Sequence, residues 1–221
     1  MIDVPIFSAE SCSVITGDKT ILAPISFSIG VGDFVAITGP SGSGKSTLLQ
    51  LLLGFMPTST GQLLFKGQEL TISLLSELRS QTAVVFQEPV LDGQNVYDAL
   101  IQPFSYKHNH LAKPQAAQLK AEMQAVGLDD IELNQTVTTL SGGEKQRLAL
   151  VRALLLSRPI LILDEISSAL DSVNRDRIHK LLAQRKHTVI AVSHDPVWLQ
   201  RSSSILELQA FKKELNHVGY C

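Results

Sequence analysis

The sequence contains only two cysteines, Cys12 and Cys221, which lie near opposite ends of the chain. Two distant cysteines cannot form the disulfide framework of a small secreted domain, so the composition favours a reducing compartment. An excess of either charge is also missing, since 19 Lys and Arg face 21 Asp and Glu for a net charge of −2. Without a basic field, no nucleic-acid partner is expected.

Long apolar runs are absent as well. Arg, Asp or Gly interrupts the longest of them after about ten residues, well short of the ~20 that a membrane-spanning helix requires. The start Met1–Pro5 lacks the basic and apolar regions of a secretory signal peptide. We therefore expect a soluble chain that reaches a membrane only through a partner. The length of 221 residues suits one domain, or a core with an inserted lobe.

The most informative stretch present is a glycine-rich segment, Gly39–Thr47, which reads Gly-Pro-Ser-Gly-Ser-Gly-Lys-Ser-Thr. It matches the phosphate-loop pattern, in which two glycines that bracket four residues precede Lys and Ser or Thr. A strand-like run, 33–38, leads into the segment and an apolar helical run, 48–53, leaves it. Glycine lets backbone N–H groups turn toward an anion, and the following helix points its positive end at the same place.

This loop predicts a site for a nucleoside triphosphate with Mg²⁺. Lys45 would contact the β- and γ-phosphates, and the Ser46 hydroxyl would bind Mg²⁺. The alternative is a simple Gly/Ser turn before a core helix. The residues assigned to the nucleotide are Gly39, Pro40, Ser41, Gly42, Ser43, Gly44, Lys45, Ser46 and Thr47.

The pattern of apolar residues predicts a mixed α/β fold in three parts. The first part, to Gln87, contains strands with a turn at 16–19; the middle part, 88–156, loses all strand runs; and β/α alternation resumes after it. Strands are expected at 25–29, 33–38, 61–66, 83–86, 160–163, 188–192 and 204–208, and helices at 48–53, 73–79, 97–101, 114–126, 144–156 and 172–185.

Polar side chains follow three of these strands, at the sheet edge where α/β proteins bind ligands. Asp164 would hold Mg²⁺, and Glu165 would orient or deprotonate the attacking water, although such a pair can also cap the next helix. Gln87 could bind Mg²⁺ through its amide oxygen and donate to the attacking water from its amide nitrogen, or it could remain an ordinary surface residue. His194 could contact the γ-phosphate or be structural.

A second anion-binding signal is Leu140–Arg147, where Ser141, Gly142 and Gly143 open a helix. Ser141 with Glu144 three residues later also fits a capping box, and both interpretations can hold together. The chain then carries two phosphate-facing helix starts but needs only one nucleotide.

Taken in order, the phosphate loop, Gln87, Leu140–Arg147, Ile160–Glu165, Ser168–Asp171 and His194 resemble the nucleotide-binding subunit of an ATP-binding-cassette (ABC) transporter over nearly the whole chain. The resemblance implies a P-loop NTPase (RecA-like) core, 1–87 and 157–221, with an N-terminal antiparallel β subdomain and an inserted α-helical subdomain, 88–156.

The same resemblance implies a homodimer that closes head to tail on ATP, with Ser141, Gly142 and Gly143 of one copy facing the other's nucleotide and Asp171 coupling the two sites. It also implies an integral membrane permease as partner and a place on the cytoplasmic face of the bacterial inner membrane. The stretches 38–42, 93–100 and 163–171 are similar to Fet-type ATP-binding subunits, assigned to iron export. ABC systems for other solutes or lipids, and soluble ABC ATPases, remain alternatives.

The chain departs from the family pattern where an aromatic residue usually stacks on adenine. No Phe, Tyr or Trp occurs from Ser8 to Leu22, so Val14 or Ile15 would pack against the base and the preference for ATP over GTP should be modest. The apolar residues of Glu88–Tyr106 either receive the permease or pack the helical lobe. We expect Lys107–His110 to be a solvated loop and not a metal site.

Overall fold

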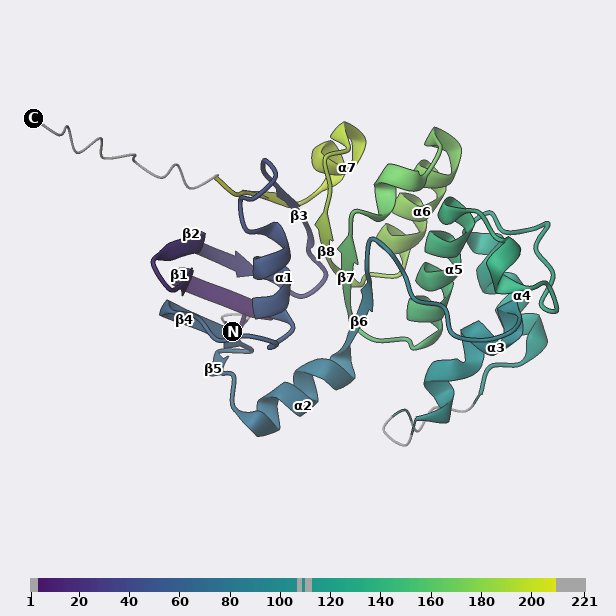
Figure 1. The fold of residues 1–221 in the computed structure, drawn as a ribbon, viewed down its shortest axis with the longest axis horizontal. Coiled ribbons are helices and arrows are strands. Elements are labelled where there is room, and N and C mark those ends of the chain that lie inside the picture. Colours follow the sequence, from purple (N-terminus) through teal and green to yellow (C-terminus); the bar gives the residue numbers. More distant parts are fainter. Residues whose placement is uncertain (1–3, 107–108, 110–112, 210–221) are drawn as a thin grey trace, which may run out of the picture.

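The computed structural model describes residues 4–106, 109 and 113–209, and two sheets organise it (Figure 1). An antiparallel sheet in the order β2-β1-β4-β5 lies on one side of helix α1, and a parallel sheet in the order β6-β7-β8-β3-β9 lies on the other. The strands are β1 (Phe7–Thr16), β2 (Lys19–Ile29), β3 (Phe34–Thr38), β4 (Thr60–Phe65), β5 (Gln68–Glu69), β6 (Thr82–Val85), β7 (Ile160–Asp164), β8 (Thr188–Val192) and β9 (Ser204–Glu207).

The helices cover the parallel sheet and build the far side of the molecule, where α3, α4 and α5 lie together (Figure 1). They are α1 (Lys45–Leu52), α2 (Ile72–Gln81), α3 (Val96–Ile101), α4 (Ala116–Ala125), α5 (Gly142–Leu155), α6 (Ser172–Gln184) and α7 (Pro196–Arg201), with 3-10 turns η1 (Gln102–Ser105), η2 (Val137–Thr139) and η3 (Ile166–Ala169).

Residues of β7 show why the parallel strands read as unbroken apolar runs. Ile160 and Ile162 belong to the core shared with α1 and the antiparallel sheet, whereas Leu161 and Leu163 belong to the core shared with α5. All four are fully buried. A strand covered by helices on both faces cannot alternate between apolar and polar residues. The predicted α/β fold with its antiparallel sheet is therefore confirmed.

The N-terminal hairpin confirms the predicted turn, since Thr16 pairs with Lys19. Its strands are longer than the short strands that the sequence predicts. The pairing of β1 with β2 shifts register between Ala9 and Cys12, where polar and apolar residues do not alternate. Ser11, within this shift, has a positive φ of 47°. Bulges of this kind hide a continuous strand from a search for period-two alternation.

Helix α7 is not among the helices that the sequence predicts. The Asp195 side chain accepts hydrogen bonds from the amides of Val197 and Trp198, and Pro196 occupies the first helical position. A capping Asp followed by Pro is a recognised helix start, but six residues are too few for a helical repeat to show.

Candidate functional site

The parallel sheet brings the predicted polar segments to one edge. In the order β6-β7-β8-β3, Val85 pairs with Leu163, Asp164 with Val192, and Ile37 with Val192, so the four strands end level. The residues that follow these ends are Gln87, Glu165, His194 and the glycine-rich loop. Four segments that are far apart in sequence therefore meet along one line.

The loop between β3 and α1 depends on glycine at two positions. Gly39 has a φ of 145°, and a Cβ there would lie 2.4 Å from the Leu208 carbonyl oxygen; at Gly44, with a φ of 96°, it would lie 2.7 Å from the Ile21 carbonyl oxygen. Gly44 is also the N-cap of α1 and offers no side-chain cap. The first amides of α1 are thus available to an anion, as the anion-site hypothesis requires.

Lys45 lies across the mouth of this loop. Its Nζ donates to the carbonyl oxygens of Gly39 at 2.7 Å and Pro40 at 3.1 Å. Ser43 is 2% exposed, and its hydroxyl, which has no hydrogen-bond partner within the described part of the chain, lies under the loop, 2.8 Å from where a Cβ at Gly39 would be. The loop thus presents a cation next to open helix amides, which suits a polyphosphate.

Asp164 and Glu165 form the acidic part of the edge. Burial raises the pKa of Asp164 above its ordinary value, the neighbouring charge of Glu165 raises it further, and Lys45 opposes both. Glu165 has a φ of 50°, and its amide donates to the Val192 carbonyl oxygen at 3.0 Å. A non-glycine residue held in this left-handed conformation is a feature of constrained sites.

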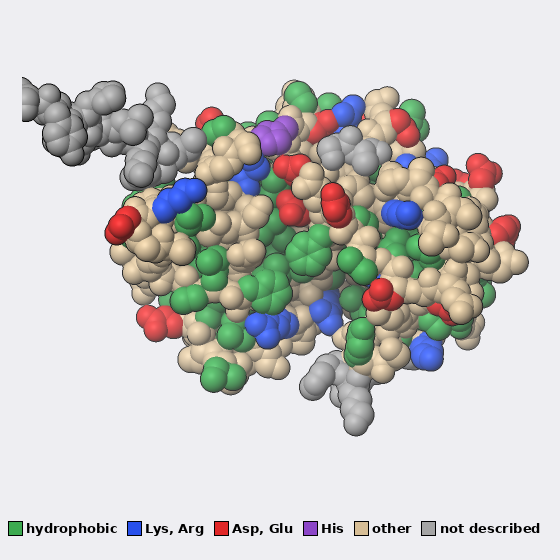
Figure 2. All heavy atoms as spheres, in the orientation of Figure 1, with side chains coloured by type: hydrophobic (Ala, Val, Ile, Leu, Met, Phe, Trp, Pro, Cys, Tyr) green, Lys and Arg blue, Asp and Glu red, His purple; other side chains and the backbone are tan. Residues whose placement is uncertain are grey.

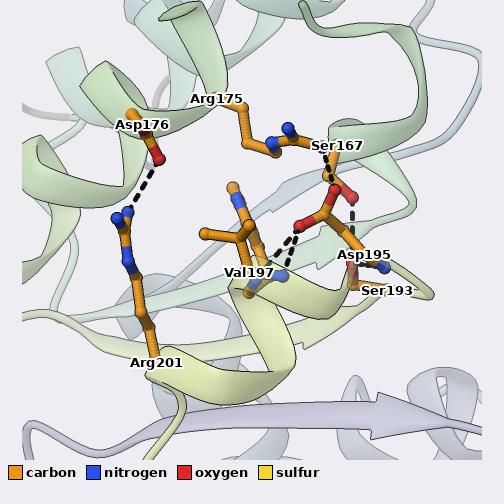
Figure 3. A network of polar contacts seen from close by, with 8 residues as sticks. Ser167, Arg175, Asp176, Ser193, Asp195, Val197 and Arg201 are labelled. Atoms are coloured by element: carbon orange, nitrogen blue, oxygen red, sulfur yellow. Dashed lines mark hydrogen bonds and ion pairs between the residues drawn. The ribbon is translucent and has the colours of Figure 1, made fainter. Parts of the chain in front are cut away.

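His194 and Glu165 line one open pocket of about 310 Å³. Ser167, Leu170, Arg175, Ser193, Asp195 and Pro196 complete its wall. Figure 3 shows the polar contacts beneath it, in which Ser167 reaches Ser193 and Arg175 reaches Asp195. These four supporting residues were missed by the sequence analysis, because no local motif marks contacts across 20 or more positions.

Gln87 is tied to the helix that carries the second glycine motif. The Gln146 side chain of α5 donates to the Gln87 carbonyl oxygen at 2.9 Å. Gln146 is only 6% exposed, whereas Gln87 is exposed. This bond spans 59 positions and has no signature in the sequence. It makes α5 part of the scaffold of the site.

Ser141, Gly142 and Gly143 are not part of the glycine-rich loop's surroundings. They start α5, which packs on the opposite face of the parallel sheet from α1. The predicted capping box is present: Glu144 Oε2 accepts from the Ser141 amide at 2.7 Å and from its hydroxyl at 2.8 Å. Both hydrogen bonds lower the pKa of Glu144. Within one chain, these residues and the loop do not face the same anion.

Asp171 begins α6 as its N-cap, accepting from the Asn174 amide at 2.9 Å and from its side chain at 2.6 Å. These hydrogen bonds lower the pKa of Asp171, which remains exposed. Of the two candidates to pack a base, Val14 is 3% exposed and belongs to the core, whereas Ile15 is 45% exposed. Only Ile15 is therefore accessible to a nucleotide.

Other parts of the surface bear on remaining predictions. Of Lys107–His110, only Asn109 lies within the described residues. Cys221 lies outside them. Among described residues, no three His, Cys, Asp or Glu gather as a metal cluster. No helix in the described ranges is long and apolar enough to cross a bilayer.

Figure 2 shows hydrophobic side chains gathered on the surface where α1 and β6 lie. Phe55, which follows α1, is 60% exposed, and Phe86, which follows β6, is 50% exposed.

Comparison with known proteins identifies the family. The family model for the ABC transporter matches residues 22–168. The chain is 34% identical over 220 residues to the "Probable iron export ATP-binding protein FetA" of Escherichia coli K12, which covers 98% of this chain and 96% of that protein. It is 37% identical over 191 residues to the energy-coupling factor transporter ATP-binding protein EcfA1 of Oenococcus oeni, covering 83% and 68%. It is also 35% identical over 196 residues to the ATP-dependent lipid A-core flippase of Haemophilus ducreyi, covering 86% of this chain but only 34% of the flippase.

Solved structures agree. A bacterial Atm1-family ABC exporter with ATP bound superposes with a TM-score of 0.79 at 28% identity, covering 94% of this chain and 37% of the exporter. CbiO1 of Clostridium perfringens, part of the ABC transporter complex cbiONQ, gives a TM-score of 0.77 at 25% identity, covering 93% and 85%. The chain belongs to the ABC transporter family, as an ATP-binding subunit with ATPase activity.

Proposed function

We propose that the chain hydrolyses MgATP at the edge formed by β6, β7, β8 and β3, and that a second copy completes each site. The observation that carries this proposal is the level ending of the four strands, which brings Gln87, Glu165, His194 and the Gly39–Thr47 loop together. In this arrangement Gly39–Thr47 holds the phosphates of the bound nucleotide.

The donor set at this edge suits Mg²⁺. Asp164 carries a carboxylate whose charge is disfavoured by burial and by Glu165, and a divalent cation would relieve both effects. Ser46 supplies a hydroxyl oxygen and Gln87 an amide oxygen, which are ligands that Mg²⁺ accepts. The cation, when bound, would neutralise charge on the phosphate oxygens. Ser46, Gln87 and Asp164 are the residues that would hold it.

Four side chains have roles in the hydrolytic step that we propose. Glu165 orients a water molecule in line with the γ-phosphate and accepts its proton, since its backbone is fixed to β8. Lys45 leaves the loop carbonyls and donates to the phosphates instead. His194 donates to the γ-phosphate from the next strand, and Gln87 helps to place the water.

The second copy supplies what one chain does not bring to its own loop. Ser141, Gly142 and Gly143 of that copy would face the γ-phosphate, because their exposed helix start points a dipole outward. Asp171, which is exposed at the start of α6, would face the opposite copy and couple the two sites. Closure of this homodimer then depends on the triphosphate.

We propose that closing and opening drive an integral membrane permease, and that the chain works on the cytoplasmic face of the bacterial inner membrane. The core would be 1–87 with 157–221, and the helical subdomain 88–156 would receive the permease near Glu88–Tyr106. Val90 and Tyr106 of this stretch are exposed and support the contact, whereas Phe104 is buried in the core of the helical lobe. Likeness to FetA over 98% of the chain favours iron export; the EcfA1 and lipid flippase relatives favour other substrates as the alternative.

Replacing Glu165 with Gln tests the hydrolytic step. The variant should bind ATP normally, because the loop is untouched, and should hydrolyse it at least about a hundredfold more slowly. Glu69→Gln, an exposed carboxylate in β5, is the matched control and should hydrolyse ATP at the normal rate. Normal hydrolysis by the Glu165 variant would remove the role assigned to this residue.

A further inference from the structure

The two neighbours of His194 are held by contacts that the hydrolytic step does not use. Ser193 is 1% exposed, and its Oγ lies 2.9 Å from Ser167 Oγ and accepts the Asp195 amide at 3.0 Å. Its own amide donates to the Ile37 carbonyl oxygen at 3.1 Å. The chain on one side of His194 is thus fixed to β3 and to η3.

The Asp195 side chain fixes the other side. One carboxylate oxygen accepts the amides of Val197 and Trp198, and the other accepts Arg175 Nη1 of α6 (Figure 3). The side chains of Asp195 and Arg175 are only 10% and 24% exposed. Because so little of this charge pair is exposed, water screens it weakly, and it resists rearrangement more than a surface pair does.

Glu165 stands on the segment that receives these contacts. Its amide donates to the Val192 carbonyl oxygen at 3.0 Å, and two residues later Ser167 meets Ser193. The segments that carry Glu165 and His194 are therefore joined at two points, and Arg175 joins the far end of the second segment to α6.

We propose that Arg175 and Ser167 are positioning residues that hold His194 opposite Glu165, an inference that rests on the proposed role of His194. Both residues line the pocket of Glu165 and His194, and their side chains bond to Ser193 and Asp195, the two neighbours of His194. Arg175 acts through Asp195 and Ser167 acts through Ser193, so that the exposed imidazole extends from a backbone clamped on both sides. An error of about 1 Å in such a group can cost a hundredfold in rate.

The test is a double-mutant cycle between Arg175→Gln and His194→Ala, with steady-state ATP hydrolysis as the readout. Arg175→Gln alone should lower kcat about tenfold and leave the KM for ATP within about twofold, because the phosphate loop is untouched. In the His194→Ala background the same change should have no further effect, since the group that it positions is gone. If the Arg175–Asp195 pair were merely structural, Arg175→Gln would lower kcat by the same factor in both backgrounds.

The chain supplies a matched control in Arg201→Gln. This change breaks the Arg201–Asp176 pair, 2.9 Å apart on the same two helices but outside the pocket, and should leave kcat unchanged (Figure 3). If Arg175→Gln does not fold, Ser167→Ala enters the same cycle and should lower kcat about threefold in the His194 background only.

Unchanged kcat in the variant that folds, or an equal loss in both backgrounds, would overturn the positioning role while leaving the proposed function intact. Normal hydrolysis by His194→Ala alone would overturn the role of His194 and the positioning role with it. The two failures are thus distinguishable.

Discussion

Helices α1 and α5 both begin with a glycine motif that can meet a phosphate, yet their first turns differ. The start of α1 has Gly44 as N-cap in a left-handed conformation and no side-chain cap, so its amides stay open. The start of α5 is closed by the reciprocal bonds of Ser141 and Glu144. The same helix dipole therefore ends in an open cradle at one site and in a self-capped surface at the other.

This difference indicates how each helix start is used. A loop with open amides can wrap an anion that it binds alone, whereas a capped and exposed helix start is stable without a ligand and suits contact with a preformed surface. The Ser141 hydroxyl donates to Glu144 at 2.8 Å. In the proposed dimer it would instead donate to a phosphate of the nucleotide that is bound to the other copy. In the proposed function, α1 then provides the affinity for the nucleotide, and α5 provides the contact that closes the proposed dimer.

Removing the cation at α1 should give the largest effect. Lys45→Ala deletes the charge that the phosphates would pair with and should weaken ATP binding at least about 30-fold, which corresponds to about 2 kcal/mol. Titration calorimetry measures this directly. Lys66→Ala, which breaks a surface pair with Glu77 and a cation–π contact with Phe65, should bind ATP normally. Equal affinities of the two variants would contradict the assignment.

Adding one methyl group to each motif should separate the two helix starts. Gly39→Ala places a Cβ 2.4 Å from the Leu208 carbonyl oxygen at a φ of 145°, and should cost about 1–3 kcal/mol of stability together with ATP binding. Gly142→Ala meets nothing within 4 Å and should leave stability and single-chain ATP binding unchanged while hydrolysis falls. Thermal melts and binding titrations check both variants. A destabilised Gly142 variant would contradict the free space that surrounds Gly142.

Asp164→Asn should raise the stability of the fold and abolish ATP hydrolysis. Because burial and Glu165 raise the pKa of Asp164, its ionised form destabilises the folded state at pH values above that raised pKa. The variant should therefore melt at a higher temperature than the wild type at neutral pH, as differential scanning calorimetry can measure. The gain should shrink as the pH falls through the raised pKa and vanish below the ordinary value of 3.8, while Mg²⁺-dependent hydrolysis is lost at every pH.

Glu144→Gln should give the smallest effect. Hydrogen bonds from Ser141 lower the pKa of Glu144, so the carboxylate contributes stability above its ordinary value of 4.5 and loses it as the pH falls further. Since the group is largely solvent-screened, the expected loss at neutral pH is only about 0.5 kcal/mol. Melts of the two proteins should converge in acid; a gap that persists there would assign the cap to packing instead.

Sequence reasoning reached those parts of the fold that local pattern determines. Ile160–Leu163 is apolar because both of its faces are covered, and the glycine-rich loop is marked because few other residues take its conformations. Contacts between distant segments stayed hidden, as with Gln146 and Gln87 or Arg175 and Asp195. Their partners depend on how helices lie on the sheet, which no local repeat encodes. The choice between Val14 and Ile15 likewise required the register of β1.

The most direct test of the account is the mass of the Glu165→Gln protein in ATP, measured by light scattering. We expect it to double from 24.1 kDa with ATP and to stay single without it. Adding Ser141→Arg should keep the protein single while ATP still binds, whereas Thr71→Arg, which removes the exposed cap of α2, should still permit the dimer. A Ser141→Arg protein that dimerises normally, or a Glu165→Gln protein that stays single in ATP, would contradict the claim that two copies complete each site.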